Sequence, residues 1–257
     1  MSHYLVAIII KKEKVKNVEN EIGELLAPYD EALEVEEYDE KCSCIGWKAV
    51  CELNKIEEEN FGSWDALKKQ FWKEVSAKYE ITSTYDSKCT KKMSDEIDAI
   101  WEVTTEKRLK WKEEAFNAHP LHDKADPNCS SCKGTGIYKT TYNPDSKWDW
   151  WVIGGRFNGV IRAEHRSSAD GFNFDEEYQK LEENITSVED YVEQIEKNKT
   201  QLPFAIVTPD GEWYEEGNMG WFAVVSNKNK KWEDDAIDIL KEYSGKDYAI
   251  VGIDLHI

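Results

Sequence analysis

The sequence lacks a hydrophobic run long enough to cross a lipid bilayer, which takes about 20 consecutive apolar residues. The apolar run Tyr4–Ile10 is much shorter, and it has neither the basic start nor the small-residue cleavage site of a signal peptide. We therefore expect a cytoplasmic protein with no membrane-bound segment, in which Tyr4–Ile10 is a buried strand. In that reducing compartment a disulfide framework among the six cysteines is not expected, so close cysteine pairs indicate metal binding.

An excess of basic residues is also missing. The chain of 257 residues has 33 Lys and Arg against 52 Asp and Glu, a formal net charge of -19. Nonspecific nucleic-acid binding is therefore not expected, because such binding depends on Lys and Arg that displace phosphate counterions. The simplest interpretation of the acidity is a well-solvated surface, and the alternative is mimicry of a nucleic-acid backbone.

The familiar local motifs of catalysis are absent as well. The chain contains no G-x-S-x-G, no Walker loop and no H-E-x-x-H, and it shows neither internal repeats nor low-complexity tracts. The sequence therefore points to a site without naming a reaction.

The first half of the chain predicts strands followed by helices. After the strand at 4–10, Asn17 caps a helix that ends near Ala27, before Pro28. Strands are expected at 33–38 and 45–53. From Ser63 the apolar spacing becomes helical, which predicts one helix over 64–79 and a second over 94–118. These two helices indicate an insertion at about 63–118.

The second half returns to alternating strands and helices. We expect helices over 175–183, 187–197 and 232–243, a hairpin over 204–215, and strands over 221–226 and 248–255. The predicted fold is therefore an α+β fold with a mostly antiparallel sheet and packed helices, and one version of it has a ferredoxin-like core. We predict a single elaborated domain over 1–257, with a knuckle and Trp-rich segment at 119–157 after the insertion.

Within that segment, Cys129 and Cys132 form a C-x-x-C followed by two glycines, a pattern typical of a zinc knuckle. His119 and His122 lie just upstream and complete a Cys2His2 set, which predicts a structural zinc; His256 is the substitute if one of them does not bind. Free thiols and a redox pair are the alternatives. The further cysteines Cys42, Cys44 and Cys51 are interpreted as buried thiols rather than as a second site.

The run from Trp148 to Arg156 predicts either a core strand of large anchors or a binding pocket. In the second interpretation an indole face stacks on a planar ligand, the glycines let the backbone approach, and the guanidinium pairs with phosphate or carboxylate. The candidate ligand-binding residues are Lys147, Trp148, Trp150, Gly154, Gly155, Arg156, Trp221 and His256.

Near the carboxyl end, Asp254 and His256 lie on one face of the last expected strand. Such a pair suits general base chemistry, so these two are the catalytic candidates; a surface hydrogen bond is the simpler interpretation.

Several motifs together resemble a widespread family of uncharacterised proteins of bacteriophages and prophages. They are Leu26-Ala-Pro-Tyr-Asp-Glu31, Asn143-Pro-Asp-Ser-Lys-Trp-Asp-Trp150, Ile153-Gly-Gly-Arg156, Thr208-Pro-Asp-Gly-Glu-Trp213, Met219-Gly-Trp221 and Asp254-Leu-His-Ile257. The resemblance brings no activity with it. It implies a small accessory phage protein that acts in the cytoplasm of a bacterial host.

Combining this context with the predicted pocket gives the leading hypothesis of a counter-defence protein that sequesters a nucleotide-derived signalling molecule. The alternatives are an enzyme that hydrolyses or modifies a nucleotide-type ligand, and an acidic inhibitor that mimics nucleic acid and binds a host protein. The sequence is compatible with self-association into homo-oligomers.

Overall fold

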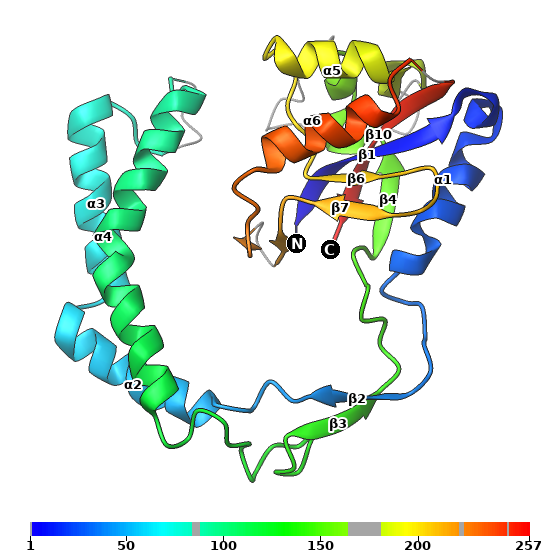
Figure 1. Ribbon diagram of the computed structural model, residues 1–257. Helices are drawn as coiled ribbons and strands as arrows, with labels where there is room; N and C mark the ends of the chain where they lie inside the picture. The colour runs from blue at the N-terminus through cyan, green and yellow to red at the C-terminus, as the bar shows by residue number, and fades with distance from the viewer. Residues whose placement is uncertain (1, 84–87, 164–180, 221–223, 246) are drawn as a thin grey trace. The chain divides into compact units, whose positions relative to one another are not determined.

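The structure is a computed structural model that describes residues 2–83, 88–163, 181–220, 224–245 and 247–257 (Figure 1). The chain divides into two compact units. Unit 1 combines the two ends of the chain, Met1–Glu36 and Thr141–Ile257, and unit 2 is the segment Glu37–Thr140 between them. The predicted insertion at 63–118 thus falls inside a larger inserted unit.

Unit 1 is built on a six-stranded sheet whose central strands are β1 (His3–Lys11) and β10 (Tyr248–His256). These pair antiparallel over their full length, from His3 opposite His256 to Lys11 opposite Tyr248. The strand order is β4-β10-β1-β6-β7, and β5 also pairs with β10. The remaining strands are β4 (Trp150–Ile153), β5 (Ile185–Ser187), β6 (Ala205–Val207) and β7 (Trp213–Glu215), with a separate pair β8 (Asn218–Met219) and β9 (Val225–Ser226).

The two faces of this sheet are covered by different helices. On one face α1 (Val18–Leu26) packs through Val18, Ile22 and Leu26 against alternate residues of β1. On the other face lie α5 (Val188–Glu196) and α6 (Trp232–Glu242). Because β1 is covered on both faces, its run from Tyr4 to Ile10 is continuously buried.

Short 3-10 helices connect these elements in unit 1. They are η1 (Lys12–Asn17), η2 (Ala27–Tyr29), η3 (Gly155–Phe157), η4 (Val160–Arg162) and η6 (Leu181–Asn184). The Ser187 hydroxyl caps α5 by accepting from the Asp190 N–H at 3.1 Å.

Unit 2 begins and ends with a two-stranded ladder, β2 (Tyr38–Lys41) paired antiparallel with β3 (Ile137–Thr140). Between them lie α2 (Trp47–Phe61), α3 (Trp64–Tyr79) and α4 (Lys91–Ala118). A small core of Phe71, Val75, Ile81 and Ile97 holds α3 against α4.

The predicted class, α+β with a mostly antiparallel sheet, is confirmed. The pair β1–β6 is parallel, which an all-antiparallel ferredoxin-like sheet would not contain. The strand predicted over 45–53 is wrong, because this segment forms the start of α2. Its apolar residues Ala49 and Leu53 are four apart and both buried, a helical spacing.

Two other predictions fall partly on residues that are not described. The helix expected over 175–183 keeps only its end within the described part, where 181–184 is the 3-10 helix η6. The strand expected over 221–226 is described from 224 onward, with β9 at Val225–Ser226. Trp221 lies outside the described residues.

Candidate metal centre and acid–base site

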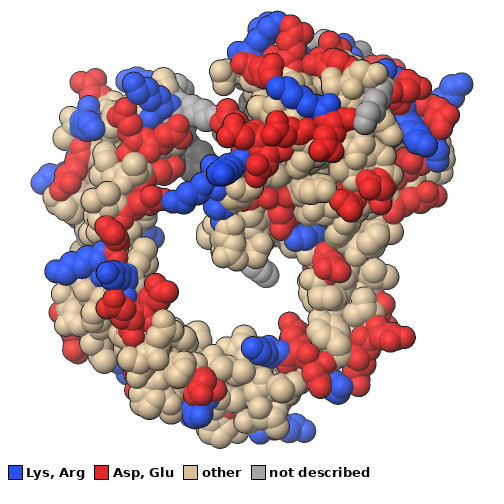
Figure 2. Space-filling view, viewed as in Figure 1, with Lys and Arg blue, Asp and Glu red and all other residues tan. Residues whose placement is uncertain are grey.

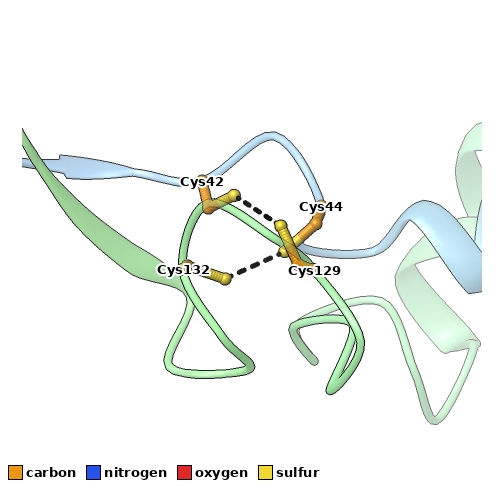
Figure 3. A group of neighbouring side chains, drawn as sticks. All are labelled: Cys42, Cys44, Cys129 and Cys132. Carbon is orange, nitrogen blue, oxygen red and sulfur yellow. Dashed lines mark hydrogen bonds between the residues drawn. The ribbon is translucent and has the colours of Figure 1, made fainter.

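Four thiols of unit 2 gather beside the β2–β3 ladder (Figure 3). Cys42 and Cys44 follow β2 directly, and Cys129 and Cys132 lie on the loop that leads to β3. Their sulfur atoms all lie within 4.8 Å of one another. Cys42 Sγ is 3.5 Å from Cys129 Sγ, and Cys44 Sγ is 3.4 Å from Cys132 Sγ. The cysteines are free rather than disulfide-bonded, so this group could hold a metal ion.

The backbone around Cys129 and Cys132 favours the charged form of these two thiols, whereas burial raises the pKa of Cys44 to about 12 and the pKa of Cys42 is also raised. The N–H groups of Cys132 and Ser131 lower the pKa of Cys129 to about 6. Burial raises the pKa of Cys132. Hydrogen bonds from the Gly136 N–H, Cys44 and the Gly134 N–H together lower it by more, so the net shift is downward. Gly134 and Gly136 have positive φ values of 86° and 79°, a backbone conformation that glycine adopts without strain. A metal ligand must be a thiolate, so these amides suit metal binding.

Two of the four metal ligands predicted from sequence, Cys129 and Cys132, belong to this group, whereas His119 and His122 do not. The Nε2 atom of His119 lies 3.2 Å from Glu52 Oε2, and its Nδ1 accepts from the Leu121 N–H. The Nδ1 atom of His122 is 2.7 Å from the His119 carbonyl oxygen. The β2–β3 ladder brings Cys42 and Cys44 to the C-x-x-C instead, so a four-thiol set replaces the expected Cys2His2 knuckle.

Sequence reasoning missed Cys42 and Cys44 because it placed a strand after them and interpreted the alternation as packing. A better signal was present, since C-x-C and C-x-x-C each supply two ligands from a short loop, and together they make a complete tetrahedral set. Cys51, on α2, is outside the group.

A second cluster lies in unit 1, where β1, β10 and β4 run side by side. His3 stands opposite His256 in the β1–β10 register, and His256 stands opposite Trp150 in the β10–β4 register. The two imidazole centroids are 4.9 Å apart. The Trp150 indole stacks on His256 at 5.4 Å with an interplanar angle of 15°. Trp150 also lies 5.3 Å from His3, so the three rings, one from each of three neighbouring strands, contact one another, and we call this group the histidine row.

Each histidine of this row is paired with a carboxylate. His3 Nδ1 lies 2.9 Å from Asp254 Oδ1, and His256 Nδ1 lies 2.5 Å from Asp149 Oδ1. The side chains of His3, Asp254 and His256 are 9%, 2% and 6% exposed, whereas Asp149 is 31% exposed. A carboxylate at Nδ1 fixes the proton there and leaves Nε2 as the proton-exchanging atom. Among the described residues, neither Nε2 has a hydrogen-bond partner.

Asp254 also anchors the Gly-Gly-Arg turn. Its Oδ2 accepts from the Arg156 backbone N–H at 2.9 Å. Gly155 has a φ of 53°, and a Cβ there would lie 2.4 Å from Asp254 Cβ; a Cβ on Gly154 would lie 2.5 Å from the Asn184 amide nitrogen. The two glycines are therefore required by close packing of the protein with itself.

The predicted binding residues divide between this cluster and the core. Trp148 packs against the α1 side of the sheet and donates its indole N–H to the Leu26 carbonyl at 2.9 Å. Lys147 Nζ lies 2.8 Å from Glu215 Oε1. Trp151 alternates with Trp150 along β4. It packs in the same core cluster as Trp148, which precedes the strand. One cluster contains the catalytic candidate Asp254 and four of the predicted binding residues, Trp150, Gly155, Arg156 and His256.

His3 is the member of this cluster that sequence reasoning missed. It precedes the buried run of β1, and only the pairing of β1 with β10 brings it to Asp254 and His256.

Within the described residues, no helix is both long and apolar enough to span a membrane. Comparison of the chain with known protein families, with curated proteins and with solved structures finds no match.

Proposed function

We propose that unit 1 acts on a phosphate ester of nucleotide type at the row of His3, His256 and Trp150. The observation that carries this proposal is the pair of Asp–His couples, whose imidazoles lie 4.9 Å apart on neighbouring strands. One imidazole can take the proton of an attacking water while the other gives a proton to the leaving oxygen. The Trp150 indole contacts both imidazoles, so a base held at this site would meet an aromatic side chain, and Arg156 follows in the adjoining turn.

The two Asp–His couples favour an enzyme over a protein that only sequesters its ligand. Trp148 and Lys147 already have partners within the protein, so the pocket expected around them has less support. Capture without turnover remains the second candidate, because Trp150 contacts both imidazoles and the backbone N–H of Arg156 contacts Asp254. In either case the proposed setting is the cytoplasm of a phage-infected bacterium, with a nucleotide-derived immune signal as ligand.

Incubation with a nucleotide-rich extract of infected bacteria tests the proposal, with native mass spectrometry of the protein and analysis of the spent extract. We expect one nucleotide to be depleted and a cleaved product to appear. His3→Ala and His256→Ala should abolish the depletion, and His122→Ala in unit 2 is the matched control. Intact ligand released on denaturation would support sequestration instead, and an unchanged extract with no added mass would contradict both.

The third alternative, mimicry of nucleic acid, would concern unit 1. Unit 1 has two acidic residues for every basic one, whereas unit 2 is almost balanced. Acidic side chains lie over α6 in Figure 2, but lysines are interspersed with acidic residues across the face shown. A host-protein complex whose formation weakens steeply with salt would favour this alternative.

For unit 2 we infer that the ion is structural zinc, held by Cys42, Cys44, Cys129 and Cys132. Four thiolates fill a tetrahedral shell and leave no position for a substrate, which fits a structural role. Elemental analysis of the purified protein should find one zinc per chain. A red protein that contains iron in its place would contradict the assignment.

A further inference from the structure

Unit 2 has a recess between α2 and α4 that neither proposal uses. It is open to solvent and has a volume of about 330 Å³, and its lining includes Glu57 of α2, Ser63 and Trp64 at the start of α3, and Arg108 and Lys112 of α4. Ligand pockets in proteins commonly begin at about this size.

An ion triad lines this recess, and two of its members, Glu57 and Arg108, are buried. Arg108 Nε donates to Glu57 Oε1 at 2.6 Å, and Lys112 Nζ donates to Glu57 Oε2 at 2.7 Å. The guanidinium lies over the Trp64 ring, 3.9 Å from its centroid. Glu57 is 2% exposed and Arg108 is 4% exposed. Both carboxylate oxygens of Glu57 are therefore occupied.

The hydrogen bonding of Arg108 is nevertheless incomplete. Its Nη1 is buried and has no hydrogen-bond partner among the described residues. A buried donor without an acceptor costs about 1–3 kcal/mol, and more when it is charged, so native proteins rarely leave one. An acceptor from outside the chain would remove this cost.

The charges of the triad indicate what kind of acceptor fits. Within the triad, Arg108 and Lys112 carry two positive charges against the single negative charge of Glu57, and the solvent-exposed carboxylate of Glu58 offsets the remaining positive charge only in part. Glu58 also lines the recess, so a doubly charged phosphate would meet repulsion. A carboxylate has a single charge and a planar pair of oxygens, which suits the edge of a guanidinium.

An apolar recess of about 360 Å³ adjoins this one, and Lys112 lines both. Its other walls are Val50 and Leu53 of α2, and Leu109, Glu113 and Phe116 of α4. Leu109 is 51% exposed, which is unusual for a leucine within a helix pair. Apolar surface next to a charged anchor favours a ligand with a hydrocarbon body and an acidic head.

We propose that α2 and α4 of unit 2 bind an amphiphilic carboxylate, with the acid at Arg108 and Lys112 and the apolar body against Leu53, Leu109 and Phe116. The carboxylate belongs either to a small apolar acid or to the end of a peptide with apolar side chains. The site is separate from both the thiols and the histidine row.

Arginine Nε–H signals in a nitrogen-15 spectrum of the full chain provide the test, because the sequence has only four arginines. The Arg108 signal is identified by its loss in Arg108→Lys. We expect octanoate to shift it, with a Kd below about 1 mM, and octanol to leave it unchanged. The peptide acetyl-Leu-Leu-Phe, as free acid and as amide, distinguishes the two sources of the carboxylate.

Variants with matched controls separate binding from loss of structure. Lys112→Gln should weaken octanoate binding about tenfold, whereas Lys110→Gln, which removes the same charge outside the recess, should not. Leu109→Ser should also weaken binding, and Val103→Ser on the exposed side of α4 should not. The proposal is overturned if neither acid shifts the Arg108 signal, or if octanol and the peptide amide shift it equally.

Discussion

Replacing Glu57 by Gln should destabilise unit 2 far more than a surface substitution would. The change leaves Arg108 buried with its ion pair broken, and Lys112 loses its partner as well. Removal of one member of a buried ion pair costs about 3–5 kcal/mol. For a unit of roughly 100 residues, that loss lowers the melting temperature by more than about 10 °C.

The Glu57 carboxylate should also make the stability of unit 2 depend on pH, in a direction that follows from its pKa shift. Burial raises the pKa of Glu57. The hydrogen bonds from Lys112 and Arg108 together lower it by more, so the net shift is downward. A carboxyl group with a lowered pKa in the folded state contributes stability that is fully present above its unfolded pKa of about 4.3. That stability is lost as the pH falls through the lower folded-state pKa.

Calorimetry at neutral pH and in acid, on the wild type and Glu57→Gln, measures both effects. Units 1 and 2 have separate cores, so two transitions are expected, and only that of unit 2 should move. Glu59→Gln, on the exposed side of α2, is the matched control. The reasoning is refuted if Glu57→Gln costs less than about 1 kcal/mol at neutral pH, or if its cost is the same below pH 3.

Two further predictions test the thiol group and the glycine turn. Loss of a residue that only supports a metal ligand weakens binding by up to ~100-fold, so Cys42→Ser, which removes a ligand, should weaken it by more. Cys51→Ser should keep the ion. Equal metal content in both variants would rule out Cys42 as a ligand. Gly155 has a φ of 53°, and the Cβ that Gly155→Ala adds would lie 2.4 Å from Asp254 Cβ. Gly211 has a φ of 86°, and the Cβ that Gly211→Ala adds would have no atom within 4 Å. Both pay about 1–2 kcal/mol for the backbone, so chemical denaturation should show a clearly larger loss for Gly155→Ala, and equal losses would mean that the turn relaxes.

Local patterns in the sequence were sufficient for the strands and helices with strong periodicity. The continuous apolar run of β1 and the helical spacing of Trp64, Phe71 and Val75 both correspond to observed elements. The segment after Cys44 was not predictable in the same way, because its short apolar run fits a strand or a helix equally well.

The candidate sites depend on contacts between distant parts of the chain. Cys42 meets Cys129 only because β2 pairs with β3 across three intervening helices. His3 meets Asp254 only because the first and last strands are neighbours. Periodicity and spacing report on nearby residues, so one half of each site was visible in the sequence and its complement was not.

The ladder β2–β3 also makes the inserted unit modular. Tyr38 lies opposite Thr140, so the segment closes upon itself and its two ends leave side by side. For unit 1 the insertion is then equivalent to a tight loop instead of an open excursion of roughly 100 residues, which spares about 2 kcal/mol of loop-closure entropy. A short turn could therefore replace the whole segment without loss of the sheet, and another self-closing module could be grafted at the same junction.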